Sequence, residues 1–184
     1  DVQAVVEGLV ARVGTLQGIA LAFKVPGVAP GCAAELLQLA KARQLGKRLA
    51  EMVVEDLPHI EDNNSEDWLL IDHLKMLYIF VAEQCIKECP DGILYQVSLS
   101  AFRDAIEVGV PGAYDAMSGC SADTFYQLAY YRKQQDQVAN NMGKAMAQLY
   151  GKADDWKIIT IGEHLFTAFQ QKCRMECEKT EYLL

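Results

Sequence analysis

The chain has 184 residues, of which 51% are hydrophobic and 23% are charged, and its formal net charge is −8. This composition can bury a full core, which excludes a disordered chain. The acidic balance also argues against nucleic-acid binding, because the densest basic cluster is interleaved with acids on one predicted helix: Lys41, Arg43, Lys47 and Arg48.

The first predicted helix covers residues 2–23, where apolar side chains recur at steps of three and four. Glu7 and Arg12 lie where a membrane span would have to accept charge, so we expect a buried helix and no membrane span. Pro26 and Gly27 follow it and end the helical pattern. The chain starts at Asp1 without a methionine, and we expect a processed, secreted protein.

Two more helices complete the first half. Apolar spacing predicts a helix over Ala33–Asp56, which Pro58 ends. The polar segment that follows contains Asn63 in an Asn-x-Ser sequence, which predicts a glycosylation site on an exposed loop of a secreted protein. The next helix runs from about Glu66 to Cys89. Acidic residues at its start can accept hydrogen bonds from the free N–H groups there and stabilise the positive end of the helix dipole.

The second half repeats this order of elements. We expect helices over about Ile93–Val108, Ala122–Tyr150 and Asp155–Glu178. The last of these again starts with acidic residues in front of a tryptophan, as in the first half. No segment alternates as a strand does, so the predicted fold class is all-α.

The cysteines and tryptophans indicate an internal duplication. Trp68 and Trp156 lie 88 positions apart, and the cysteines form two triplets with the same offset, Cys32, Cys85 and Cys89 followed by Cys120, Cys173 and Cys177. The sequence therefore predicts two tandem three-helix repeats, residues 1–88 and 89–184. We expect them to pack as one compact, disulfide-braced helical domain.

Cysteine spacing limits the disulfide pairing. Cysteines four apart on a helix have β-carbons about 5–6 Å apart, whereas a disulfide needs about 3.5–4.5 Å, so each should bond another element. The pairing that treats both repeats alike is Cys32–Cys85, Cys120–Cys173 and Cys89–Cys177. Exchanging the two cysteines within each helical pair is nearly as good, and the sequence does not choose between these pairings.

Metal and enzyme chemistry have little support in the sequence. His59, His73 and His164 do not repeat with the cysteines, and zinc clusters favour tighter ligand spacing, so no metal site is predicted. Nothing resembles a nucleophile elbow, a phosphate-binding glycine loop or a metal-binding helix. We expect no catalytic residue and no cofactor.

Two candidate surfaces come from comparing the repeats. Met76, Ile79 and Ile86 replace polar residues of the equivalent helix, which indicates either burial within the monomer, the preferred explanation, or a partner-binding patch. Most aromatic residues lie in the second half. We predict a ligand pocket between its last two helices, lined by Tyr126, Tyr130, Phe166 and Phe169, although core packing is the preferred explanation for any single one of these rings.

These observations leave two functional hypotheses. The first is a secreted, non-enzymatic carrier that binds a hydrophobic small molecule, such as a lipid or a pigment, in an apolar cavity between helices. The alternative is a protein-interaction or self-assembly subunit that uses the apolar face of the first repeat. Its partner would be another protein or, in a homo-oligomer, a second copy of the chain.

Overall fold

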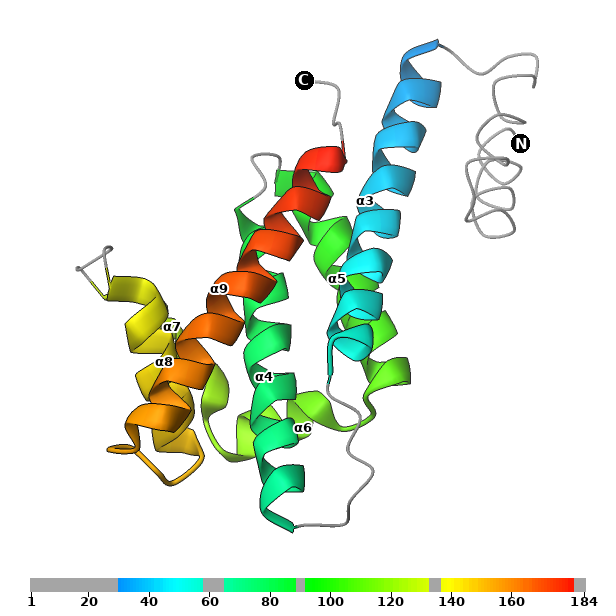
Figure 1. Ribbon diagram of the computed structural model, residues 1–184. Coiled ribbons are helices and arrows are strands. Elements are labelled where there is room, and N and C mark those ends of the chain that lie inside the picture. The colour runs from blue at the N-terminus through cyan, green and yellow to red at the C-terminus, as the bar shows by residue number, and fades with distance from the viewer. Residues whose placement is uncertain (1–29, 58–64, 89–91, 133–136, 181–184) are drawn as a thin grey trace.

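The described part of the chain folds into helices (Figure 1). The computed structural model describes residues 30–57, 65–88, 92–132 and 137–180. All regular elements in these ranges are helices, so the described chain is all-α. The bounds are α3 (Pro30–Glu55), α4 (Ser65–Lys87), α5 (Gly92–Gly109), α6 (Ala113–Gly119), α7 (Ala122–Tyr130), α8 (Val138–Leu149) and α9 (Trp156–Lys179).

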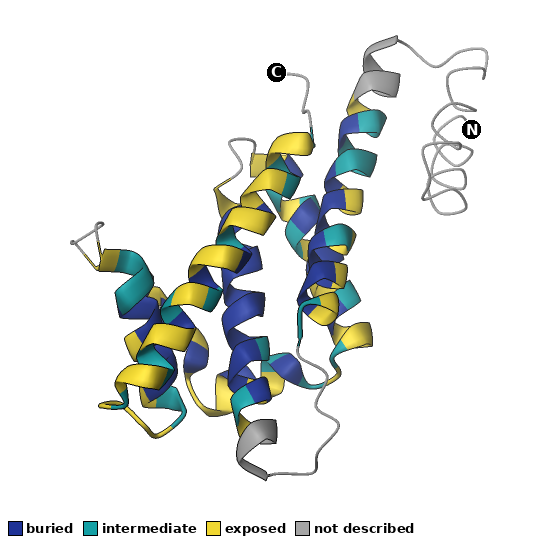
Figure 2. Ribbon diagram, viewed as in Figure 1, coloured by how far each residue is buried: buried dark blue, intermediate teal, exposed yellow. Residues whose placement is uncertain are grey.

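Helix α4 is the centre of the fold (Figure 2). Most of its residues from Ile71 to Ile86 are buried, on all sides of the helix. A helix that is apolar all round must be covered all round. Helices α3 and α5 lie on one side of it and α7, α8 and α9 lie on the other (Figure 1), and α6 packs against the part of α4 around Phe80 and Glu83.

Helices α4 and α9 lie side by side and run in the same direction (Figure 1). Tyr78 stacks on Phe169 with ring centroids 4.2 Å apart, and Arg174 donates to Glu88 at 3.3 Å. These contacts join residues 91 and 86 positions apart, close to the 88-residue offset of the cysteine triplets. The duplication itself, with its boundary near residue 88, stays a prediction.

The helix ends follow the predicted ones closely in four cases and differ in one. Asp155 caps α9 as expected, because its carboxylate accepts the Lys157 N–H at 2.9 Å. The predicted helix over Ala122–Tyr150 is wrong: α7 ends at Tyr130 and α8 begins at Val138. Residues 132–137 are all charged or amide side chains, so no apolar face continues the helix there. Helix α6 was not expected. The predicted helix over residues 2–23 lies outside the described residues.

Candidate functional site

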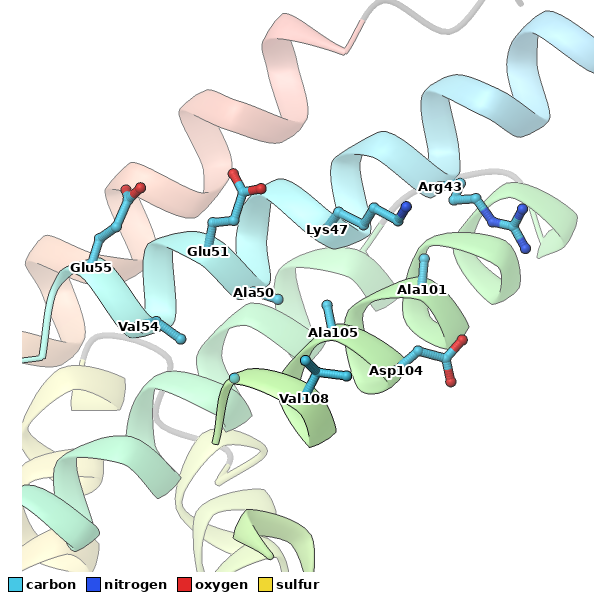
Figure 3. A pocket seen from close by; sticks show the side chains of 11 residues that line it. Arg43, Lys47, Ala50, Glu51, Val54, Glu55, Ala101, Asp104, Ala105 and Val108 are labelled. Atoms are coloured by element: carbon cyan, nitrogen blue, oxygen red, sulfur yellow. The ribbon is translucent and has the colours of Figure 1, made fainter. Parts of the chain in front are cut away.

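The backbones of α3 and α5 approach each other closely at Gly46. A β-carbon at this position would lie 2.1 Å from the carbonyl oxygen of Ser98 and 2.8 Å from the backbone nitrogen of Phe102. Only a glycine allows such an approach, since any side chain would overlap the backbone of α5. From this crossing the two helices continue in the same direction and leave a groove between them (Figure 3).

The groove has a volume of about 680 Å³ and lies on the outer side of the α3–α5 pair. Its apolar lining combines small residues, Ala50, Ala101 and Ala105, with two larger and exposed ones, Val54 and Val108. Val54 is 41% exposed and Val108 is 83% exposed. Val54 and Val108 give the groove an exposed apolar surface that a partner could cover.

Charged residues border the groove unevenly. Arg43 and Lys47 lie at one end, where neither forms an ion pair with any residue that the structure describes. Glu51 and Glu55 point away from α5 (Figure 3), and both accept hydrogen bonds from Arg48, at 3.2 and 3.3 Å. Arg48 therefore offsets only part of the acidic charge on α3, whereas Arg43 and Lys47 line the groove with Asp104 of α5 and have no ion-pair partner among the described residues.

A second polar cluster lies where α4, α5 and α6 meet. The Glu83 side chain is only 8% exposed, and Arg103 donates to both of its oxygens, at 2.9 and 3.1 Å. The Tyr114 hydroxyl also donates to Glu83 at 3.0 Å, and Lys87 lies 3.5 Å away. The carboxylate is thus paired on every side and holds three helices together.

The protonation of Glu83 fits a structural role. Burial alone raises the pKa of a carboxyl group, but the hydrogen bonds and charges of Arg103, together with Lys87 and Tyr114, outweigh it. The pKa of Glu83 is therefore lowered, and the group stays ionised at neutral pH. A cavity of about 390 Å³ borders this cluster, but an ionised carboxylate already bonded to an arginine is a poor general acid or base.

The predicted ligand-binding aromatic residues lie together in the core. Tyr126, Phe166 and Phe169 are at most 2% exposed, and Tyr130 is half-buried. Phe80 contacts both Tyr126 and Tyr130, with ring centroids 5.4 and 6.0 Å apart, and Tyr130 contacts Phe166 at 6.3 Å. The rings fill the space between α4, α7 and α9 themselves, and none of them lines the groove or the cavity described above.

The predicted partner-binding residues are also buried. Met76 is 8% exposed, and Ile79 and Ile86 are fully buried in the core around α4. Of the two explanations that the sequence offered for these residues, the structure supports burial within the monomer. A partner could reach them only if the bundle opened.

The described cysteines form no disulfide bond. Cys120 and Cys173 do not meet, and Cys120 instead donates to the sulfur of Met76 at 3.6 Å. The pair that the structure brings together is Cys85 on α4 and Cys173 on α9, whose thiols hydrogen-bond. This contact belongs to the exchanged pairing that the sequence left open. Asn63, Cys89 and the side chain of Cys32 lie outside what the structure describes.

In comparisons with known proteins, no family model, no curated protein and no solved structure matches the chain. Among the described residues, no three histidine, cysteine or acidic side chains gather as a metal site would require. None of the described helices has the length and apolar character needed to cross a bilayer.

Sequence reasoning missed the α3–α5 groove. It treated Arg43 and Lys47 as part of an ordinary solvated face, because nothing in the 88-residue offset pairs α3 with α5. One signal was available: Gly46 lies in the middle of a strongly helical segment, where a glycine usually has a packing reason.

Proposed function

We propose that the protein is a non-enzymatic interaction subunit whose α3–α5 groove binds an amphipathic helix of a partner protein. The observation that carries this proposal is one groove that combines exposed apolar residues, Val54 and Val108, with two cations that have no ion-pair partner among the described residues, Arg43 and Lys47. The partner helix should carry an apolar stripe for the valines and alanines and an acidic side chain for the cations.

The dimensions of the groove support a helix as the ligand. Its lining on α3 spans Arg43–Glu55, which at 1.5 Å per residue is about 18 Å, or about three helical turns. Three turns present anchors at positions i, i+3 or i+4, and i+7 of a bound helix. The small side chains of Ala50, Ala101 and Ala105 would let that helix approach the α3–α5 pair closely.

The carrier function inferred from sequence stays a prediction beside this one. It needs a cavity lined by Tyr126, Tyr130, Phe166 and Phe169, and binding would have to separate rings that now contact one another or their neighbours. Saturable binding of an apolar dye, abolished by Phe166→Ala but not by Val108→Asp, would favour it. Secretion and disulfide bracing are likewise proposals, supported by the six cysteines and the Asn63 motif.

The docking proposal can be tested with helical peptides. A displayed library of three-turn amphipathic helices is selected on the wild-type protein, and the enriched peptides are titrated against variants. We expect the peptides to carry an acidic residue beside the apolar stripe. Val108→Asp should weaken binding at least tenfold. Lys47→Glu should also weaken binding, and replacing the acidic residue of the peptide by lysine should restore the affinity for this variant.

Matched controls separate docking from a general loss of structure. Leu128 on α7 is 67% exposed, so Leu128→Asp changes the same type of exposed apolar residue on another face and should leave binding unchanged. A photo-crosslinker at position 108 identifies the occupant. Cross-links to residues 2–23 of the same chain, or to a second copy, would contradict a partner helix, as would peptides that bind Val108→Asp as tightly as wild type.

A further inference from the structure

The buried contact between Cys85 and Cys173 joins the two halves of the chain. Cys85 is 3% exposed on α4, Cys173 is fully buried on α9, and their thiols hydrogen-bond to each other. Their positions are 88 residues apart, so they are the equivalent cysteines of the two predicted repeats.

We propose that Cys85 and Cys173 form a disulfide bond that ties α4 to α9, made by exchange with a low-molecular-weight disulfide of the glutathione class. One protein thiolate attacks a sulfur of the small disulfide and releases one small thiol. The second protein thiolate then attacks the mixed disulfide and releases the other. Two protein S–H bonds are replaced by one S–S bond, and the small disulfide is reduced to two thiols.

Neighbouring contacts hold the two helices in place for this bond. The stacked pair Tyr78–Phe169 lies on the N-terminal side of the cysteines, and the ion pair Glu88–Arg174 lies on the C-terminal side. The helices are therefore fixed on both sides of the two sulfurs, whereas a bond between Cys173 and Cys177 on one helix would require distortion.

Burial determines when the bond can form. The hydrogen bond that the Cys173 thiol donates to Cys85, together with burial, raises the pKa of Cys173, so its thiol stays protonated in the folded chain and is a weak nucleophile there. Exchange therefore takes place during folding, when the thiols are accessible. Once the helices have packed, the same burial shields the bond from reductants.

The bond would close a loop of almost half the chain. Constraining a loop of this length in the unfolded state raises the Tm of a protein of this size by about 10 °C or more. Cys120 offers a matched control, because it is exposed and its contacts are with Met76 and Met117 rather than with α9.

The test is to refold the full chain with and without a glutathione redox buffer, block remaining thiols after unfolding, and map the disulfide-linked peptides. We expect one linked pair to contain Cys85 and Cys173, to resist dithiothreitol until the chain unfolds, and to accompany the rise in Tm. Cys173→Ala should lose both the linked peptide and the rise, and Cys120→Ala should keep both. Full alkylation of Cys85 and Cys173 after oxidative refolding, or their linkage to other cysteines, would overturn the proposal.

Discussion

The close approach of α3 and α5 can be tested by adding a single methyl group. Gly46→Ala would place a β-carbon 2.1 Å from the carbonyl oxygen of Ser98 and 2.8 Å from the nitrogen of Phe102. Both are backbone atoms, so no side-chain rotation can relieve the overlap. Helix α5 would have to move away by about 1.3 Å or more to reach ordinary contact distance.

Two opposing effects set the size of the change. In an exposed helix, alanine in place of glycine stabilises by about 1 kcal/mol. At Gly46, overpacking against a backbone costs about 1–3 kcal/mol or more, and the displacement also separates α5 from the core residues of α3. We expect a net loss of about 2 kcal/mol in the free energy of unfolding, or about 4–8 °C in Tm for a chain of this length.

Chemical denaturation followed by circular dichroism measures this change. Gly119→Ala is the matched control, because Gly119 ends α6 on the surface and a β-carbon there meets nothing within 4 Å. The control should be neutral or slightly stabilising. If Gly46→Ala proved as stable as Gly119→Ala, the backbone contact between α3 and α5, and with it the shape of the groove, would be wrong.

Three further changes test the interior. The Tyr126 hydroxyl is buried without a hydrogen-bond partner in the described part of the chain, so Tyr126→Phe should stabilise by about 1 kcal/mol in thermal unfolding; a clear loss would mean that the hydroxyl has a partner. Glu83→Gln should cost about 2 kcal/mol at pH 7, less than a fully buried ion pair because Arg103 is half exposed. Because the pKa of Glu83 is lowered in the folded chain, its contribution to the free energy of unfolding is present above pH 4.5 and is lost as the pH falls through the folded pKa. If the Gln variant lost stability with falling pH as the wild type does, this account would be refuted. Burial lowers the pKa of His73 despite the charge of Asp72, so the unfolded chain binds its proton more readily and stability should decline below about pH 6.5. His73→Gln should reduce the loss of stability between pH 7.5 and 5.5. If stability fell with pH as steeply as in the wild type, the loss would belong to other titratable groups.

Local features of the fold were predictable from the sequence because their causes are local. An acid before an apolar run is enough to start a helix, and Asp155 caps α9 in the expected way. Apolar spacing located α3, α4, α5 and α9 to within a few residues. The break between α7 and α8 was missed because a polar stretch such as residues 132–137 can occur on the exposed face of a helix or in a connection.

Contacts between helices were not predictable, because periodicity does not say which faces meet. Glu83 and Arg103 each look like ordinary surface charges on their own helices, and only the packing of α4 against α5 brings them together. The offset of 88 residues did suggest that equivalent cysteines could meet across the repeats. It did not distinguish Cys85–Cys173 from Cys89–Cys177, since both pairs share that offset and lie one turn apart.

The most direct test of helix docking in the α3–α5 groove is chemical-shift mapping of the ¹⁵N-labelled protein during titration with a selected amphipathic peptide. We predict that the shifted amides cluster in residues 43–55 of α3 and 101–109 of α5, and that Val108→Asp removes the shifts. Shifts concentrated on α7, α8 and α9, with the α3 and α5 amides unchanged, would contradict the proposed site.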